Sequence, residues 1–479
     1  MTAGSLKSAR VIAAQVLHRF DPTRDYAGRL LDPLLDQTDQ KQRATDLVYG
    51  VIRNRNALDA VIATFSGRPV VRIDAGLLGI LRIATYELVC NPATPVYSIV
   101  DEAVNSVGTS GGRKQSGFVN AVLRQIVRHI ANRQVDLAGA HARRTLPQTP
   151  QSGCEFDTDF LPDPTTSTAA WLSLCFSLPA WLVDEWLHEF GPERTRDICL
   201  ACNRRPGLYL RVNPLRTTGD DLLSRFQAAG VQAEPVRSVP VRAYPDNASR
   251  RHCEREDAIL GSGMIRITGP HAVTQLPGFA EGLFTVQDLS ASQAVRILGP
   301  QPGWSILDLC AAPGAKTVQI AEMSRDAASV TATDIDPERL ERVRENLARV
   351  GLRSVTIVPH AQLEQRATGP FDAILLDVPC SNTGVLARRV EARFRVTAEA
   401  VREIAMIQQG LLERAATLIK PSGRICYSTC SIERRENQDM IRAFLAGHGE
   451  FNLAGESLLL PTTGPFDHDG GYVALLARR

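Results

Sequence analysis

The sequence predicts a multidomain chain in which an all-α domain comes first, a small α+β domain follows, and a doubly wound α/β domain comes last. Three observations lead to this prediction. At 479 residues the chain is too long for one ordinary hydrophobic core. Its first part repeats apolar residues at helical spacing, and its last part alternates apolar strands with helices. We place the domains at 1–134, 170–280 and 281–479, with a linker at 135–169.

The N-terminal domain is predicted from long helical patterns. Apolar residues recur every three or four positions in RATDLVYGVIRNRNALDAVIATF (43–65), AGLLGILRIATYELV (75–89) and SGFVNAVLRQIVRHI (116–130). Pro, Gly and Ser occur in several of the connections between such segments. Up to Arg133, basic residues exceed acidic ones by about six, which permits contact with nucleic-acid phosphates without requiring it.

A linker and a small mixed domain come next. Residues 135–169 are rich in Pro, Thr, Ser and Asp and show little apolar periodicity, which is a linker composition. After them, LPAWLVDEWLHEFG (178–191) and ERTRDICLACN (193–203) predict helices. A strand at LYLRVNPL (208–215) and a helix at GDDLLSRFQAAG (219–230) complete the prediction of a small α+β domain ending near residue 280.

The C-terminal domain is predicted from strands that alternate with long helices. This alternation implies a parallel, doubly wound sheet. The expected strands include SILDLC (305–310), SVTATDI (329–335), FDAILLDVP (371–379) and GRICYSTC (423–430), and the expected helices include PERLERVRENLARVG (337–351) and AVREIAMIQQGLLERAATLI (400–419).

Composition narrows the class of protein. With 44% hydrophobic and 22% charged residues, the chain has the composition of a soluble globular protein. Its apolar runs fall short of the ~20 residues that a membrane span needs. The ten cysteines are irregularly spaced, which favours a reduced pool over a disulfide framework. We therefore expect a cytoplasmic protein.

The segment LDLCAAPGAKT (307–317) predicts a ligand-binding loop. It joins an expected strand to an expected helix, where a Rossmann-like sheet receives a nucleotide-like ligand. It lacks the glycine patterns of dinucleotide and triphosphate sites. The small residues Ala311, Ala312 and Gly314 would let a ligand approach the backbone closely. Taken alone, the segment would favour an ordinary tight turn.

A carboxylate at the end of the next strand makes the ligand more specific. Asp334 follows the loop by about twenty residues and can accept hydrogen bonds from two ribose hydroxyls. A nucleoside cofactor without a pyrophosphate cradle indicates S-adenosylmethionine. Asp336 is better explained as the residue that begins the following helix.

Two cysteines, Cys380 and Cys430, each come just after a buried-looking strand. Ligands of open α/β sheets bind at this edge, so two thiols could face one pocket. A thiolate that adds to carbon 6 of a pyrimidine makes carbon 5 nucleophilic, and a second group then helps proton removal and release. The alternative is two buried small apolar side chains. Asp377 could bind the cytosine edge or the cofactor, or could simply be a capping or solvated carboxylate.

These motifs resemble those of RNA (cytosine-5) methyltransferases of the RsmB (Sun/Fmu) family. The resemblance rests on QDLSASQ (287–293), DLCAAPGAKT (308–317), LLDVPCSNTGV (375–385) and YSTCSIERREN (427–437). Upstream, YSIVDEAV (97–104) and SGFVNAVLR (116–124) resemble the NusB-like helical RNA-binding domain that is fused to RsmB members. The resemblance implies S-adenosylmethionine-dependent methylation of a cytosine at carbon 5 in 16S ribosomal RNA.

The resemblance also implies roles for particular residues. Cys430 of the Thr-Cys motif would be the nucleophile, and Cys380 of the Pro-Cys motif would assist product release. From its position before Cys380 we also predict Asp377 as a catalytic residue. His360 stands where the family usually has an acidic residue near the adenine, and we include it. The implied cofactor-binding residues are Cys310, Ala311, Ala312, Pro313, Gly314, Ala315, Lys316, Asp334, Asp377 and His360.

The expected partner is 16S ribosomal RNA with an unpaired or extruded cytosine, because a thiol cannot reach carbon 6 inside a stacked helix. We expect a monomer without a metal ion. Two alternatives stay open: a cytosine-5 methyltransferase that acts on transfer RNA, and a non-catalytic RNA-binding factor of ribosome assembly. The intact Cys380, Cys430, Asp334 and Lys316 disfavour the second, because a binding module has no need of them.

Overall fold

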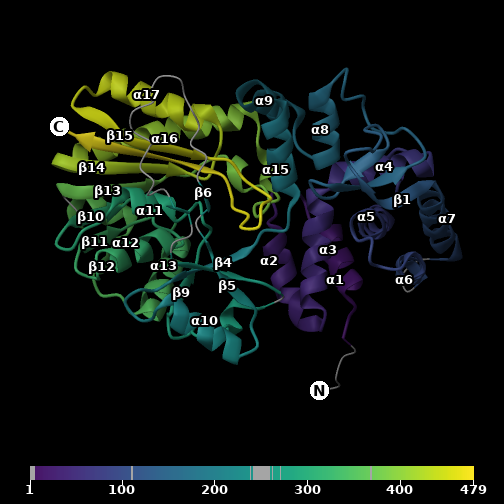
Figure 1. The fold of residues 1–479 in the computed structure, drawn as a ribbon, viewed down its shortest axis with the longest axis horizontal. Helices are drawn as coiled ribbons and strands as arrows, with labels where there is room; N and C mark the ends of the chain where they lie inside the picture. The colour runs from purple at the N-terminus through teal and green to yellow at the C-terminus, as the bar shows by residue number, and fades with distance from the viewer. Residues whose placement is uncertain are drawn as a thin grey trace. The chain divides into compact units, whose positions relative to one another are not determined.

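The computed structural model describes residues 6–108, 112–237, 239–240, 259–260, 263–269, 271–366 and 369–479. The chain divides into two compact units (Figure 1). Unit 1 comprises Met1–Arg205 and Leu386–Val396, and unit 2 comprises Pro206–Val385 and Thr397–Arg479. Residues 241–258, which the sequence places in the middle domain, lie outside the described residues.

Unit 1 is mostly helical, as the apolar spacing predicts. Its N-terminal core includes Ile12 and Val16 of α1, and Leu47 and Val51 of α3, all of which are buried. Residues three or four positions apart share one helix face, so each helix turns such a stripe inward. The helices are α1 (Ala9–Arg19), α2 (Ala27–Leu31), α3 (Lys41–Arg53), α4 (Arg55–Ser66), α5 (Ala75–Cys90), α6 (Val96–Gly108) and α7 (Arg113–His129), with 3₁₀ turns η1 (Asp32–Gln37) and η2 (Val70–Arg72).

Short strands lie within the stretch 135–169, which the sequence predicts to be a linker. β1 (Ile130–Asp136) and β2 (Thr145–Pro147) both pair antiparallel with β3 (Ser152–Phe156). Phe156 is buried and stacks on Phe65 of α4, with ring centroids 5.4 Å apart. Strands this short, broken by Pro and Gly, leave little periodicity in the sequence. Tertiary packing rather than local pattern therefore orders this segment.

The two helices expected after the linker form, and both fall within unit 1. α8 (Thr168–Phe176) packs against α4, and α9 (Ala180–Asn203) packs against α3. Within α9 the helical backbone is interrupted at Gly191 (φ 77°), just before Pro192. This interruption separates the two helices that the sequence predicts, because a side chain other than that of glycine rarely adopts such a φ.

The segment Leu386–Val396, which contains the short helix α15 (Ala392–Arg395), also belongs to unit 1. Val390 is fully buried in the core formed by α1 and α3. The Glu391 carboxylate accepts a hydrogen bond from the Ala27 amide at the start of α2 (2.6 Å). The segment is thus a structural part of the helical unit, although it follows the Pro-Cys motif in the sequence.

Unit 2 begins with a small antiparallel sheet, which matches the strand and helix expected after residue 207. Its strand order is β5-β8-β4-β9, and α10 packs on β5 and β8. Leu210, Phe226 and Phe284 are buried in the core between the helix and the sheet. The elements are β4 (Leu208–Val212), α10 (Gly219–Ala228), β5 (Ala233–Pro235), β8 (Met264–Ile267), η3 (Val273–Gln275) and β9 (Phe284–Val286), with a separate pair of β6 (Val239–Pro240) and β7 (Ile259–Leu260).

The rest of unit 2 is the predicted α/β domain. Its seven-stranded sheet has the order β12-β11-β10-β13-β14-β16-β15, in which the first five strands are parallel and the last two are antiparallel. The strands are β10 (Ser305–Asp308), β11 (Ser329–Ala332), β12 (Val355–Ile357), β13 (Phe371–Asp377), β14 (Ile419–Thr429), β15 (Phe451–Leu459) and β16 (Gly471–Arg478). The other elements are α11 (Gln293–Leu298), α12 (Ala315–Met323), α13 (Pro337–Val350), η4 (His360–Gln362), α14 (Leu363–Arg366), η5 (Thr383–Val385), α16 (Ala398–Leu418), η6 (Arg434–Glu436) and α17 (Gln438–Gly447).

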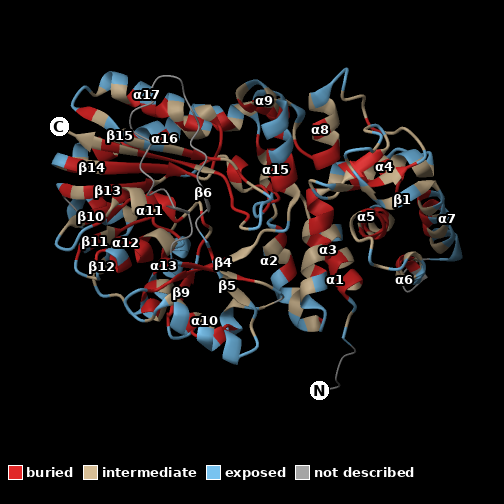
Figure 2. Cartoon of the chain, in the orientation of Figure 1, coloured by how far each residue is buried: buried red, intermediate tan, exposed pale blue. Residues whose placement is uncertain are grey.

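Helices cover both faces of this sheet. Ala373 and Leu375 of β13 join a core with α11 and α12, while α16 packs on β13 and β14. Ile374 and Leu376, which point to the opposite face, are equally buried, and Figure 2 shows the same burial along the central strands. A parallel sheet buried on both faces explains why these strands appear as continuous apolar runs in the sequence.

Asp336 begins α13, as the sequence predicts. Its carboxylate accepts hydrogen bonds from the Glu338 and Arg339 amides (2.9 and 3.2 Å), and the helix ends at Gly351 in the left-handed conformation. In the part of the chain that the structure describes, every helix is too short or too polar to cross a membrane.

Candidate functional site

Most of the predicted site residues gather at one edge of the seven-stranded sheet, together with Asp308. Asp308 ends β10, Asp377 ends β13, and Cys430 directly follows β14. These strands are parallel neighbours, so their carboxyl ends share one edge. The strand order also reverses between β10 and β13, because β11 and β12 lie on one side of β10 and β13 on the other. Open α/β sheets bind their ligands at such a reversal.

The two thiols meet at this edge. The register pairs Asp377 of β13 with Ser428 of β14, and Cys380 and Cys430 follow these residues by three and two positions. The Sγ atoms of the two cysteines are 3.0 Å apart. Parallel neighbouring strands thus bring together two side chains that lie fifty positions apart in the sequence.

The two cysteines have different surroundings. Cys380 is buried, whereas Cys430 is half-buried and its thiol contacts the Asn382 side-chain oxygen at 3.3 Å. The hydrogen bond with Cys430 raises the pKa of Cys380 well above its ordinary value, and burial and the negative charge of Glu436 act in the same direction. Cys380 therefore keeps its proton and can donate an S–H hydrogen bond to Cys430.

An ion pair lies beside the thiols. Lys316, in the first turn of α12, contacts the Asp377 carboxylate at 2.7 Å, and the Ser428 hydroxyl donates to the other oxygen of Asp377 at 2.8 Å. Burial lowers the pKa of Lys316, but the Asp377 carboxylate outweighs it, so the pKa is raised overall. The negative charge of Cys430, when ionised, raises it further. Lys316 thus places a positive charge at this edge of the sheet.

Two more carboxylates lie at the ends of β10 and β11. Asp334 is 4% exposed, and its oxygens accept hydrogen bonds from the amides of Ala312 and Asp336, both at 3.1 Å. Asp308 accepts a hydrogen bond from the Thr317 hydroxyl at 2.7 Å, while its other oxygen is buried without a partner. Burial raises the pKa of Asp308 to about 7, partly opposed by the Thr317 hydrogen bond.

The loop between β10 and α12 contains the predicted cofactor residues Cys310 to Lys316. Arg339 of α13 donates to the Ala312 carbonyl at 2.8 Å, and Asn346 donates to the Pro313 carbonyl at 3.0 Å. Gly314 has a φ of 106°, and a side chain there would approach the backbone of Val343 to 3.2 Å. The loop therefore passes so close to α13 that glycine is required at this turn. Burial raises the pKa of the Cys310 thiol.

The contacts of His360 are with residues outside this cluster. It begins the 3₁₀ turn η4 after the edge strand β12, and its Nε2 atom is 3.3 Å from a guanidinium nitrogen of Arg414. Its Nδ1 atom is buried without a partner. Among the described residues, no hydrogen bond or ion pair joins His360 to the other predicted site residues.

Sequence reasoning missed three polar residues of the site: Asp308, Gln408 and Glu436. Asp308 could have been found, because it ends an apolar strand immediately before the ligand-binding loop. Glu436 lies within the quoted Thr-Cys motif, but its distance from Cys430 in the sequence does not reveal that it contacts both cysteine loops. Gln408 is one polar residue in a long helical pattern, where nothing local marks it as buried.

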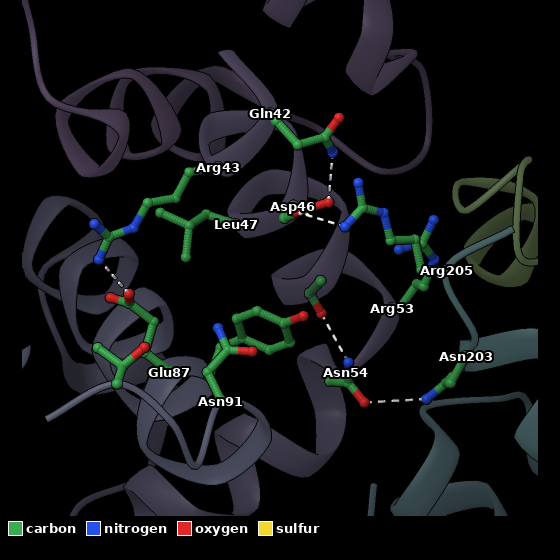
Figure 3. Close-up of a pocket in the computed structure, with 13 residues that line it drawn as sticks. Gln42, Arg43, Asp46, Leu47, Arg53, Asn54, Glu87, Asn91, Asn203 and Arg205 are labelled. Carbon is green, nitrogen blue, oxygen red and sulfur yellow. Dashed lines mark hydrogen bonds and ion pairs between the residues drawn. The ribbon is translucent and has the colours of Figure 1, made fainter. Parts of the chain in front are cut away.

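A polar pocket of about 490 Å³ lies in unit 1 (Figure 3). Four of its charged residues form ion pairs, since Arg43 contacts Glu87 at 3.0 Å and Arg205 contacts Asp46 at 3.1 Å. Arg53 donates to the Ala387 carbonyl at 2.7 Å. All of its lining residues belong to unit 1, whereas every predicted site residue belongs to unit 2. This pocket is therefore separate from the thiol site.

Comparison with known proteins identifies three matching regions. Residues 295–463 match the model of the 16S rRNA methyltransferase RsmB/F family, and residues 7–128 match the NusB family. Residues 178–242 match the ferredoxin-like domain of RsmF/B-like methyltransferases. The first match contains Cys380, Cys430 and the loop that follows β10.

Similar chains extend these matches to most of the sequence. A Synechocystis protein named probable ribosomal RNA small subunit methyltransferase B is 32% identical over 453 residues, which cover 93% of this chain and 90% of that protein. The crystal structure of PH0851 has the same fold, with a TM-score of 0.71 at 23% identity over 98% of this chain and 99% of that one. NSun6 from Pyrococcus horikoshii, crystallised with SFG, has a TM-score of 0.51 at 20% identity and covers 63% of this chain and 98% of that one.

Proposed function

Because the chain belongs to the RsmB/F family of 16S rRNA methyltransferases, we propose that it methylates carbon 5 of a cytosine in small-subunit ribosomal RNA. The observation that carries the cytosine-5 chemistry is the pair of thiols, 3.0 Å apart, at the ligand-binding edge of the sheet. One thiol suffices to activate a pyrimidine ring, and a second can serve the later steps of the same reaction. A methyltransferase that acts on a nitrogen or hydroxyl would need neither.

S-adenosylmethionine fits the residues at the ends of β10 and β11. The Asp334 carboxylate has about four acceptor positions, of which backbone amides use two, so two remain for ribose hydroxyls. The buried orphan oxygen of Asp308 offers a further acceptor or, when protonated, a donor at the same edge. The loop from Cys310 to Lys316 would line the cofactor. When bound, the cofactor supplies an electrophilic methyl group.

The reaction would begin at Cys430. Its thiolate adds to carbon 6 of the cytosine, a C–S bond forms, and the electron pair released into the ring makes carbon 5 nucleophilic. Lys316 favours this step, because its positive charge stabilises the thiolate. Asp377, held by Lys316 and Ser428, would accept a hydrogen bond from the N4 edge of the base and orient it.

Product release would require the second thiol. Once carbon 5 carries the methyl group, its proton must leave to a base, and the electrons of the C–H bond restore the ring double bond as the C–S bond breaks. Cys380 contacts the Cys430 sulfur and, because it keeps its proton, would donate an S–H hydrogen bond that stabilises the departing thiolate. Cys430 would then be regenerated.

The substrate would be an unpaired or extruded cytosine, because the thiol approaches the face of the base. The NusB-like helices of unit 1 would hold the RNA through contacts between basic residues and phosphates, which weaken as salt rises. A truncated protein that begins near Ala170 and methylates RNA as well as the full chain would contradict this role.

The two cysteines can be separated experimentally. Cys380→Ala should accumulate a covalent protein–RNA species that survives denaturing electrophoresis, because attack continues while release is slowed. The double variant Cys380→Ala, Cys430→Ala is the control and should form no adduct. An adduct in Cys430→Ala but not in Cys380→Ala would exchange the two roles.

Bisulfite sequencing tests the substrate. Ribosomal RNA from cells with and without the gene should differ at one cytosine of the small-subunit RNA. A difference in transfer RNA alone would replace the proposed substrate, and no difference in any RNA would favour a non-catalytic assembly factor.

A further inference from the structure

A buried carboxylate lies behind the thiol pair. Glu436 ends the 3₁₀ turn η6 and has no exposed surface. Its Oε1 atom accepts hydrogen bonds from the Ser381 amide and from the Gln408 side chain, both at 2.9 Å. Its Oε2 atom accepts from the hydroxyls of Ser381 and Ser431, the latter at 2.5 Å. Four neutral donors therefore converge on one carboxylate.

Three of these donors come from the two loops that contain the cysteines, the Pro-Cys loop with Cys380 and the Thr-Cys loop with Cys430. Ser381 directly follows Cys380, and Ser431 directly follows Cys430. Gln408 of α16 adds a second connection, because its amide also donates to the carbonyl of Pro379, immediately before Cys380, at 2.9 Å. The carboxylate of Glu436 thus bridges the residues next to the two reactive sulfurs.

Other contacts join the same two loops. The Gly384 amide donates to the Cys430 carbonyl at 3.0 Å, and the Ile432 amide donates to the Thr383 hydroxyl at 3.1 Å. These contacts hold the Pro-Cys loop at positions three and four residues beyond Cys380. At Ser381, which is adjacent to that cysteine, the Ser381 hydroxyl contacts the Ser431 hydroxyl at 3.0 Å. Glu436 adds two hydrogen bonds at the same residue, from the Ser381 amide and hydroxyl.

Stability alone does not explain a carboxylate at this position. Removing a carboxylate from water is costly, and well-packed apolar residues usually stabilise a core at least as well. A group that accepts four hydrogen bonds does, however, fix the directions from which its donors approach. Because those donors flank both cysteines, the benefit of Glu436 is geometric.

We infer that Glu436 is a positioning residue that holds the Pro-Cys and Thr-Cys loops together so that the two sulfurs stay in contact. The inference concerns the proposed thiol chemistry and so rests on the proposed function. Glu436 touches neither substrate nor cofactor in this role. It acts through Ser381 and Ser431 on the separation of Cys380 and Cys430.

The test measures this separation without RNA or cofactor. Diamide oxidises two neighbouring thiols to a disulfide: the Sγ–Sγ bond forms, and the two electrons and two protons reduce diamide to the hydrazine. In the full-length protein, alkylation followed by peptide mass spectrometry gives the rate at which Cys380 and Cys430 become linked. Sulfurs that start in contact should link rapidly in the unaltered protein.

Glu436→Ala should slow the linkage about tenfold or more, because all four hydrogen bonds are lost. Glu436→Gln should restore most of the rate, since an amide keeps one acceptor oxygen and the serine hydroxyls can turn to accept from its nitrogen. Glu456→Gln is the matched control. This carboxylate of β15 bonds the Tyr472 hydroxyl at 2.5 Å instead of the cysteine loops, and its substitution should leave the rate unchanged.

A purely structural role would give another result. Thermal unfolding would shift in Glu436→Ala while the linkage rate of the folded protein stayed at the unaltered value, and this would overturn the inference. If Glu436→Ala fails to fold, Ser381→Ala replaces it. That variant deletes only one hydroxyl from the network and should slow the linkage by about threefold to tenfold; an unchanged rate would also overturn the inference.

A second measurement connects positioning to catalysis. In Glu436→Ala, methyl transfer to RNA should fall at least as much as disulfide formation, while S-adenosylmethionine affinity stays within about twofold, because the Asp334 carboxylate is untouched. If neither the unaltered protein nor any variant methylates RNA, the proposed function is wrong. The disulfide rates then still decide whether Glu436 positions the thiols.

Discussion

Two buried charges organise the two units of this protein in different ways. In unit 1 the Arg393 guanidinium donates to the carbonyls of Arg53, Phe176 and Cys202 at 2.6, 3.2 and 2.9 Å. These carbonyls lie at the C-terminal ends of α3, α8 and α9. In unit 2 the Glu436 carboxylate accepts from two loops and one helix side chain. Both charges are served by neutral groups instead of a single opposite charge.

Arg393 and Glu436 differ in how well their hydrogen-bond partners could be satisfied if the charge were removed. The last carbonyls of a helix have no partner within the helix and carry its negative partial charge, so a buried cation at three such ends satisfies groups that would otherwise be orphaned. Burial lowers the pKa of Arg393 to about 10, which still leaves it charged at neutral pH. Serine hydroxyls in loops can find other partners. Arg393 therefore acts mainly on stability, and Glu436 acts mainly on geometry.

The largest expected effect concerns the chemistry that the geometry serves. Cys430→Ala should abolish methyl transfer and any covalent protein–RNA adduct, because no thiolate remains to attack carbon 6. Transfer of radioactive methyl groups to ribosomal RNA measures the first, and denaturing electrophoresis measures the second. If this variant still turned over, the chemistry would not require the two sulfurs to stay in contact. The geometric role assigned to Glu436 would then lose its purpose.

Arg393→Met tests whether the buried guanidinium stabilises unit 1. Removing the guanidinium leaves several buried carbonyls unpaired and should destabilise unit 1 by about 3–5 kcal/mol. Hydrogen exchange followed by mass spectrometry should show faster exchange in α3, α8 and α9. Arg402→Met, at an exposed position of α16, is the control and should change stability by less than about 0.5 kcal/mol.

Arg393→Met also tests whether the stability of unit 1 and the geometry of the two thiols are independent. Arg393→Met should leave the rate of Cys380–Cys430 disulfide formation unchanged under conditions in which the protein stays folded. A slower rate would mean that the segment Leu386–Val396, which follows the Pro-Cys motif in the sequence, transmits the state of unit 1 to that motif. Stability and geometry would then not be separate in this protein.

Asp334→Ala should have a smaller effect that is confined to the cofactor. Losing hydrogen bonds to a charged group should weaken S-adenosylmethionine binding by about 1–3 kcal/mol. Isothermal titration calorimetry measures the change, and the disulfide rate should stay constant. Unchanged affinity would make Asp334 a residue that only supports the loop through its hydrogen bonds with Ala312 and Asp336.

The smallest expected effect concerns Asp308, a buried carboxylate with far fewer partners than Glu436. Its pKa is raised from 3.8 to about 7 in the folded protein, so the folded state binds the proton more tightly than the unfolded state. The stability that this proton contributes is fully present below pH 3.8 and is lost as the pH rises through 7. Asp308→Asn should therefore raise the free energy of unfolding at pH 8 and flatten its pH dependence between these values.

Urea unfolding of the two proteins at pH 5 and pH 8 measures this effect. Asparagine keeps an oxygen that can accept from Thr317, so the hydrogen bond of the folded state is preserved. Equal pH dependence in both proteins would show that Asp308 is served by groups beyond Thr317. The contrast with the fully satisfied Glu436 would then disappear.

The sequence by itself determined those features that depend on neighbours along the chain. Helical spacing predicted the helices of unit 1, the alternation of strands and helices predicted the parallel sheet, and the position of Asp336 predicted the start of α13. The placement of Cys380 and Cys430 at one edge was also predictable, because parallel strands that follow one another in such a sheet end on the same side. The roles of the two cysteines stay predictions.

Tertiary structure decided the features that depend on residues far apart in the chain. Leu386–Val396 follows a motif of the α/β domain, yet Val390 and Arg393 belong to unit 1, because a buried core and three helix ends satisfy them there. The strands at 130–156 are too short to show a period and are ordered by packing. Glu436 lies within a recognised motif, but its hydrogen bonds to Ser381 and Gln408 arise only when β13, β14 and α16 assemble. Local pattern records propensity and spacing, whereas burial and the sharing of hydrogen bonds between distant segments exist only in the folded chain.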